Sequence, residues 1–269
     1  MSRVCKVPPL FHHLVKTTII FEDQCFDENL GDDERSDVAV TCLGQNSPHL
    51  EELTVLPRGD NGWFVITWPT LNLFKHMPLR YLRLGHFSFG VDDEDEDNES
   101  DDEGVRNRSN QPEIKWQDLL ASVPLLEELH LERQPLDPRL LRLIALHLPN
   151  LRLLVFGNID LGKVKPSGDA KAVAAQPITL RGHSYFWPKG SYGSDDYDPP
   201  NEETIHNAAK YIFSIWPNVT ACETHRTSGD TGNAGSKPDE ATAAKLYAAI
   251  QSLKHGARND DRRQTSSTR

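Results

Sequence analysis

A short phrase of leucines that occurs four times constrains the fold of this chain more than any other feature of its sequence. The copies are SPHLEELTVL at 47–56, MPLRYLRLG at 77–85, VPLLEELHLERQPL at 123–136 and PNLRLLVFGNIDL at 149–161. They share a Leu-x-x-Leu-x-Leu frame whose last position also accepts Val or Phe. The frame residues are Leu50, Leu53, Val55; Leu79, Leu82, Leu84; Leu126, Leu129, Leu131; and Leu151, Leu154, Phe156.

The spacing of these copies predicts repeated strand–helix units. Their first frame residues are 29, 47 and 25 residues apart, and removing an insertion at 91–109 from the longest interval leaves 28. Within each frame the second and third apolar positions alternate with their neighbours, as in a short half-buried strand. A period of 25 to 29 residues is typical of leucine-rich repeats. The sequence therefore predicts an α/β fold, an irregular solenoid of strand–loop–helix units with a parallel sheet on its concave face.

The stretch LDPRLLRLIALHLP shows most clearly how each strand would be preceded by a helix. Asp137 is suited to the N-cap and Pro138 to the first helical position. The apolar residues on one face of this helix are Leu140, Leu141, Ile144 and Leu148. Pro149 would end the helix and turn the chain into the next strand. One such unit cannot bury its own apolar face, whereas stacked units form a continuous core.

Weaker copies of the frame extend the predicted repeat domain over residues 1–225. WPNVTACETH contains Val219, Cys222 and Thr224 on the frame, and QPITLRGH would place Ile178 and Leu180 inward. In HLVKTTIIF the frame residues are Leu14, Thr17 and Ile19. A Gly-, Pro- and Asp-rich stretch at 188–200 is predicted to be a loop insertion.

The C-terminal part of the chain departs from the repeat. Residues 226–238 have the composition of a linker, and residues 239–256 predict an amphipathic helix with Gly256 as its C-cap. The apolar face of that helix consists of Ala243, Leu246, Tyr247, Ile250 and Leu253. The helix would cap the last repeat or, alternatively, bind a partner. Residues 257–269 are predicted to be a disordered tail.

The acidity of the chain is concentrated in one segment. Residues 92–103 contain ten acidic side chains, and without them the net charge of −11 becomes −1. Such a block repels itself, so the insertion 91–109 is predicted to be a disordered surface loop. Calcium binding does not fit, because Asn98 and Gly104 stand where a calcium loop needs Gly and Glu. Ser100 precedes three acidic residues, which suits an acid-directed kinase.

Several functional classes find no support in the sequence. No phosphate-binding loop, catalytic triad motif or metal-ligand motif is present, so we expect no enzyme, no cofactor and no metal. A nucleic-acid binder would need a basic stripe, which a net charge of −11 does not provide. The chain lacks a long apolar run for a membrane span and an apolar signal segment. We therefore expect an intracellular protein, cytoplasmic or nuclear.

The frame resembles the leucine-rich repeat family over roughly residues 10–225 and is similar to the repeats of fungal F-box proteins. The ninth frame position lacks the family's Asn or Cys and holds Arg58, Phe87, Gln134 and Ile159. The resemblance implies a substrate-recognition part of a ubiquitin ligase adaptor, which reaches the cullin linker subunit through an N-terminal F-box. A possible first repeat at about Leu14 leaves no room for an F-box, so the linker is expected only if that module lies upstream.

Side chains between the core positions of each strand would form the binding surface for a protein partner. The candidate residues on the concave face are Glu52, Thr54, Tyr81, Arg83, Glu128, His130, Glu132, Leu153 and Val155. Tyr and Arg are common among the residues that dominate binding energy. Leu153 and Val155 are apolar on a face expected to be wet, which indicates either a covering loop or a binding patch. The predicted function is protein recognition without catalysis; the alternative is a repeat-only scaffold with no role in ubiquitination.

Overall fold

The computed structural model describes residues 11–21, 40, 42–57, 64–66, 72–85, 87–89, 111–164, 173–186, 200–224 and 240–266. The predicted acidic insertion 91–109 with Ser100, the linker 226–238 and all of the predicted loop 188–200 except Pro200 lie outside these residues.

The chain divides into two compact units, Met1–Leu126 and Glu127–Arg269, which we call unit 1 and unit 2. The division falls inside the stretch 1–225 that the sequence analysis treats as one repeat domain. In a stack of strand–helix repeats each repeat contacts mainly its neighbours, so the repeat pattern does not determine where compact units divide. The boundary, between Leu126 and Glu127, immediately precedes the strand that contains Leu129 and Leu131 of the third frame.

Unit 1 contains three parallel strands that pair in the order β1-β2-β4. Their bounds are Lys16–Phe21 for β1, Glu52–Pro57 for β2 and Tyr81–Leu84 for β4. A second, two-stranded parallel sheet consists of β3, Phe64–Ile66, and β5, Phe87–Phe89. Helix α3, Gln111–Ser122, confirms the helix predicted before the third frame. Phe87 packs edge-on against Trp116 of this helix, with ring centroids 5.6 Å apart.

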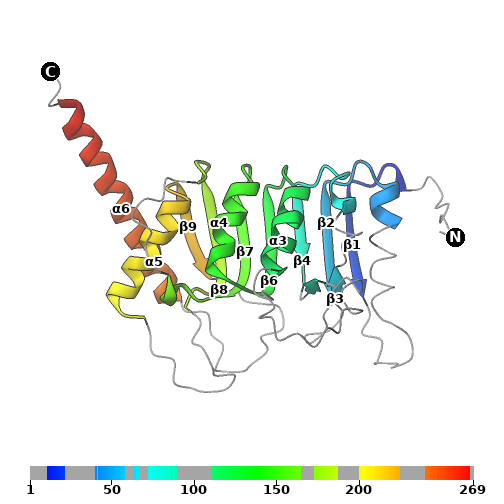
Figure 1. Cartoon of the computed structure of the whole chain (residues 1–269), viewed down its shortest axis with the longest axis horizontal. Helices are drawn as coiled ribbons and strands as arrows, with labels where there is room; N and C mark the ends of the chain where they lie inside the picture. The colour runs from blue at the N-terminus through cyan, green and yellow to red at the C-terminus, as the bar shows by residue number, and fades with distance from the viewer. Residues whose placement is uncertain are drawn as a thin grey trace, which may run out of the picture. The chain divides into compact units, whose positions relative to one another are not determined.

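Unit 2 contains four parallel strands in the order β6-β7-β8-β9. Their bounds are Glu128–Leu136 for β6, Leu153–Ile159 for β7, Ile178–Ser184 for β8 and Val219–Thr224 for β9. The helices are α4, Pro138–His147, α5, Glu202–Ile215, and α6, Glu240–Ser266, with a short 3-10 turn η3 at Leu161–Lys163. Helices α4 and α5 lie on one face of these strands (Figure 1). The prediction of an α/β fold with parallel strands is confirmed.

The repeated frame supplies the core of both units. All twelve residues of the four frames are buried, with at most 1% of their surface exposed. Equal frame positions pair across neighbouring strands: Leu53 with Leu82 in unit 1, and Leu129 with Leu154 in unit 2. The weaker copies follow the same register, because Thr17 pairs with Leu53 and Leu180 pairs with Leu154. The alternation of each frame therefore places one side of each strand in the core.

Helix α4 begins as its sequence predicts. The Asp137 carboxylate accepts a hydrogen bond from the Arg139 N–H at 2.8 Å, and Pro138 occupies the first helical position. Hydrogen bonds from Arg139 hold the pKa of Asp137 below its ordinary value, which keeps the cap charged. The predicted apolar face is buried. The positive end of the helix dipole favours a carboxylate at this position.

Helix α5 is capped in the same manner and is tied to the start of α4. The Asn201 side chain accepts a hydrogen bond from the Thr204 N–H at 2.8 Å. The Tyr211 hydroxyl donates to the carbonyl of Pro138 at 2.8 Å. Trp216 follows the helix and is completely buried. These contacts fix the two helices on the same side of the unit 2 strands.

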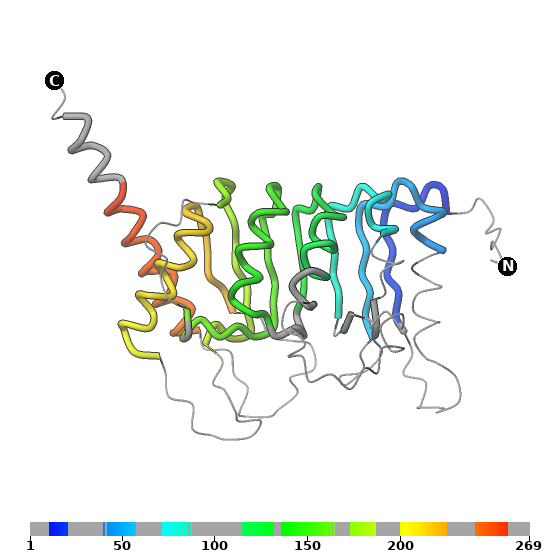
Figure 2. Tube along the Cα trace, viewed as in Figure 1, coloured from blue at the N-terminus to red at the C-terminus, as the bar shows by residue number. Residues whose placement is uncertain are grey.

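The C-terminal helix is longer than the sequence indicates. Its first half packs on α5 and β9 (Figure 2). In this half, Ala243, Leu246 and Ile250 are buried. The prediction that it ends at Gly256 is wrong, because α6 continues to Ser266 through most of the predicted disordered tail. A glycine inside a helix costs only about 1 kcal/mol relative to alanine, so one glycine does not necessarily end it.

Strand β8 shows how a degraded copy of the frame still packs. Gly182 stands at the third frame position, where the neighbouring strand has Phe156. A Cβ at Gly182 would lie 2.3 Å from the Phe156 ring, so the absent side chain makes room for that ring. The Tyr185 ring packs edge-on against Phe156, with centroids 5.3 Å apart. One large aromatic residue thus fills the space of two ordinary frame residues.

Candidate functional site

The unit 1 face is the side of β1, β2 and β4 that carries the residues between the core positions. It comprises Lys16, Thr18, Ile20, Glu52, Thr54, Leu56, Tyr81 and Arg83. The strand register joins these residues into rows, one of which runs from Lys16 through Glu52 to Tyr81. The next row runs from Thr18 through Thr54 to Arg83. The structure therefore brings together all four of the predicted unit 1 residues, each of them partly exposed.

The first row of the unit 1 face is an ion pair beside an aromatic ring. Lys16 Nζ lies 2.5 Å from Glu52 Oε2. The hydrogen bond to Glu52 is the main reason that the pKa of Lys16 is raised, with a smaller contribution from Tyr81. Both partners are well exposed, so the pair adds little stability. It neutralises the Glu52 carboxylate next to the Tyr81 ring.

The unit 1 face also carries an apolar spot that the sequence prediction missed. Ile20 is 58% exposed and is in register with Leu56. The signal was the alternation in KTTIIF, which also places Lys16 and Thr18 on this face. None of these three residues was predicted for the face, because the copy near Leu14 matches the frame weakly.

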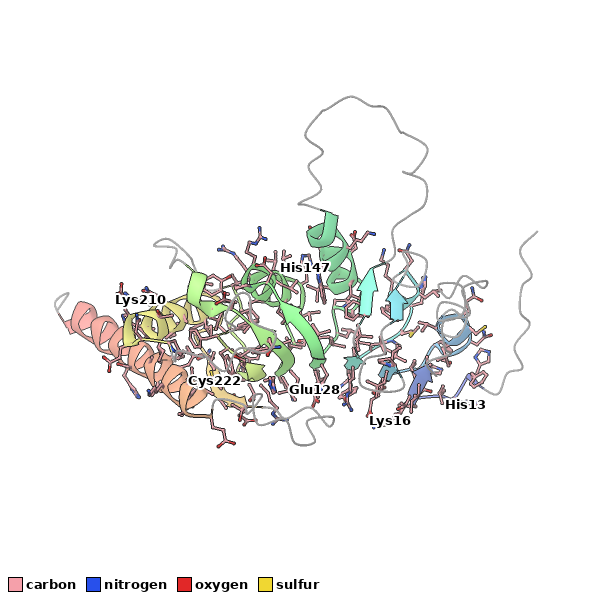
Figure 3. The ribbon with its side chains drawn as sticks, turned by 90° about the horizontal axis from the view of Figure 1, so that it is seen from below. His13, Lys16, Glu128, His147, Lys210 and Cys222 are labelled. Carbon is pink, nitrogen blue, oxygen red and sulfur yellow. The ribbon has the colours of Figure 1, made fainter. Side chains whose placement is uncertain are left out.

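The unit 2 face is the corresponding side of β6 to β9. One row consists of Glu128, Leu153, Thr179 and Ala221, and the next of His130, Val155, Arg181 and Glu223. Figure 3 shows Glu128 on the side of the unit 2 strands that faces away from His147 of α4. The structure therefore places Glu128, His130, Leu153 and Val155 in two adjacent rows. It adds Arg181 to this face. The sequence signal for Arg181 was its position next to the core residue Leu180, because successive residues of a strand point to opposite sides.

Arg181 and Glu223 form an ion pair across β8 and β9. The Arg181 Nε and Nη2 atoms donate to Glu223 Oε2 at 2.8 and 2.6 Å. Both side chains are roughly two-fifths exposed, at 37% and 43%. The positive charge of Arg181 is thus already matched by a carboxylate on the neighbouring strand. Among the described residues, no hydrogen bond to Glu223 Oε1 is formed.

Glu128 has a weaker partner at the other margin of the unit 2 face. Its Oε2 lies 3.4 Å from His130 Nε2, and its side chain is 45% exposed. The His130 side chain is only 13% exposed. An imidazole carries charge only when protonated. Whenever His130 is neutral, this pair leaves a net negative charge on the face.

The prediction that Val155 offers an exposed contact to a partner is wrong. Val155 is 1% exposed, while its neighbour along the strand, Leu153, remains partly exposed. Val155 lies in register between His130 and Arg181, whose side chains are both longer. Alternation along a strand gives the direction of a side chain, but its neighbours decide its exposure. Val155 is therefore too buried to contribute to a binding patch, and such a patch stays a prediction for Leu153.

The predicted contribution of Glu132 lies outside what the structure describes. Its backbone belongs to β6, but its side chain is among those not described. The register between β6 and β7 changes between Leu131 and Pro135.

Two titratable groups near β9 have strongly perturbed pKa values. Burial raises the pKa of the Cys222 thiol to about 12, assisted by the nearby Glu223 charge. Burial also raises the pKa of Tyr185 well above its ordinary value, and its hydroxyl lies 2.8 Å from the carbonyls of Leu180 and Glu223. Both groups are therefore protonated at neutral pH. A protonated, partly buried thiol is a poor nucleophile.

Neither a metal site nor a membrane-spanning helix is found in the part of the chain that the structure describes. Within the described residues, His, Cys, Asp and Glu side chains form no group of three or more that could hold a metal ion. Among the described helices, none has the length and apolar character required to cross a membrane.

No family model matches the sequence, and no curated protein matches it with significant similarity.

Proposed function

We propose that the chain is a non-catalytic protein-recognition module, built as an irregular leucine-rich-repeat solenoid, that binds a protein partner on its strand faces. The proposal is supported by the recurrence of one frame in seven parallel strands, with equal positions in register. A frame that fixes the core leaves the residues between its positions free to vary. Such a division suits a surface that recognises a partner.

The observation that carries this proposal is the row arrangement on each face. In unit 1, Glu52, Thr54, Tyr81 and Arg83 lie on two adjacent strands and are partly exposed. The backbone ladder holds their Cα atoms in place before a partner arrives, which lowers the entropy cost of binding. The combination of charged, hydroxyl and aromatic groups is typical of protein interfaces, in which Tyr and Arg often dominate the binding energy.

Two biological roles fit a surface of this kind. In the first, the module recognises a substrate protein for an F-box type ubiquitin ligase, and an F-box preceding it binds the cullin linker subunit. In the second, the module is a repeat-only scaffold with no role in ubiquitination. The sequence resemblance to fungal F-box proteins favours the first role, and the two roles differ in whether the linker subunit is bound.

Affinity purification from the native cell tests the proposal and separates these roles. The tag belongs at the C-terminus of the endogenous protein, so that any preceding sequence is retained. Recovery of the cullin linker subunit with a recurrent second protein supports the adaptor role. Recovery of one recurrent protein without the linker supports the scaffold role.

A double variant, Tyr81→Ala with Arg83→Ala, tests whether the unit 1 face binds that recurrent protein. We expect capture to weaken roughly tenfold or more, because residues of these types often contribute over 1 kcal/mol each. The matched control is Arg142→Ala with Lys210→Ala, which removes two exposed cationic side chains from α4 and α5. Circular dichroism must show unchanged folding in both. If capture is equally strong with both double variants, the unit 1 face is not the binding surface.

A further inference from the structure

We infer that the unit 2 face selects an extended basic segment of its partner, in which an apolar side chain contacts Leu153 and flanking Lys or Arg side chains approach Glu128 and Glu223. The inference rests on the proposed function, because it specifies the chemistry of the partner on one of the strand faces. It is carried by three observations on charge, free acceptor atoms and apolar exposure.

The first observation is the balance of charge on the unit 2 face. The described Asp, Glu, Lys and Arg side chains on its two rows are Glu128, Arg181 and Glu223. Arg181 and Glu223 neutralise each other through two hydrogen bonds to one oxygen. Glu128 is then the remaining charge, and its partner among the described residues is His130. A cationic side chain would gain a charge-assisted hydrogen bond there.

The second observation is that the acceptor atoms occur at both margins of the face. Glu128 lies on β6, and Glu223 lies on β9, three strands away. Arg181 occupies Oε2 of Glu223, and within the described structure Oε1 accepts no hydrogen bond. An anionic partner would have to compete with Glu223 for Arg181. A cationic partner can use Oε1 without breaking the existing pair.

The third observation is the apolar contact between these two margins. Leu153 is in register with Glu128 on the adjacent strand and is partly exposed, whereas Val155 is buried. Adjacent strands lie about 4.8 Å apart, a distance that two neighbouring side chains of one extended segment can span. Leu153 can therefore bind an apolar side chain while Glu128 binds the basic residue beside it.

The first step of the test is selection from a displayed library of random linear peptides against the full chain. We expect selected peptides to contain an apolar residue flanked by Lys or Arg. Their binding should weaken as salt is raised, since exposed charges are screened. Selection of acidic or uncharged peptides, or of none, would overturn the inference.

The second step measures the dissociation constant of the best peptide for three variants. Glu128→Gln keeps the shape and removes the charge, and we expect it to weaken binding about tenfold. Leu153→Ala should weaken binding by a similar factor. The matched control is Glu203→Gln, which removes an exposed carboxylate from the first turn of α5 and should leave binding unchanged.

The outcomes separate this inference from the proposed function. If Leu153→Ala weakens binding and Glu128→Gln does not, the charge preference is wrong while recognition by the face stands. If neither substitution on the unit 2 face matters and the Tyr81 and Arg83 double variant also binds its partner normally, both proposals fail.

Discussion

Strands β2 and β7 carry the same frame, yet their outward faces differ. In β2, Thr54 is partly exposed between Thr18 and Arg83. In β7, the equivalent Val155 is buried between His130 and Arg181. The core side of a strand is therefore set by its own sequence. Its outer side is set by the strands beside it, which are distant in sequence.

The largest expected effect tests what the two strands share. Leu53→Ala in β2 and Leu154→Ala in β7 each truncate a side chain that is 0% exposed. We expect each to lower the free energy of unfolding by about 2–5 kcal/mol, since both leave a cavity in a packed core. Chemical denaturation of the full chain measures this. The control is Leu146→Ala, at 63% exposed, which should change stability by less than about 0.5 kcal/mol.

A second prediction concerns the glycine that lies beside Phe156 of β7. Gly182→Ala should destabilise the protein by about 1–3 kcal/mol, because its Cβ would overlap the Phe156 ring. Gly256→Ala is the matched control, with open space around it in α6. That control should stabilise the protein by roughly 0.5–1 kcal/mol if the helix continues there. Thermal unfolding shows whether each variant is stabilised or destabilised. A stabilised Gly182→Ala would contradict the packing described for β8.

The smallest effect tests the difference between the two strands directly. Val155→Thr buries a hydroxyl group and should cost about 1–2 kcal/mol, whereas Thr54→Val should stay within about 0.5 kcal/mol. The two substitutions exchange the same pair of residue types at equivalent positions. The comparison uses the denaturant concentration at the midpoint of unfolding for each variant, provided that the slopes of the unfolding transitions are equal. Equal costs at the two positions would mean that Val155 is as accessible in solution as Thr54.

Local sequence patterns predicted the parts of the fold that depend on few neighbours. The frame residues, such as Leu129 and Leu154, were predicted as core because alternation needs only one strand. The cap Asp137 was predicted because a cap depends on the residues that follow it. Gly256 shows the limit of this reasoning, because a residue favoured at helix ends is also tolerated inside a helix.

The composition of the faces depended on contacts between distant strands. Arg181 pairs with Glu223, which lies 42 residues further along the chain, so no local sequence pattern indicated the pair. Val155 alternates with the core residues Leu154 and Phe156, but its own burial could not be read from LRLLVFG alone. The weak copies at β1 and β8 concealed Ile20 and Arg181 because their frames each contain a single leucine, Leu14 and Leu180. A sheet partner compensates for such departures, as Phe156 does for Gly182.

The contact between α6 and β9 has a consequence for how this protein behaves in a crowded cell. β9 is the last strand in the described sheet order, and an uncovered edge strand is a template for pairing with another chain. Helix α6 packs on β9, and the Gln251 side chain donates to the Val219 carbonyl at 3.2 Å. The helix therefore protects one edge against self-association. Loss of its anchoring face, around Leu246 and Ile250, would therefore expose β9 to pairing with another chain.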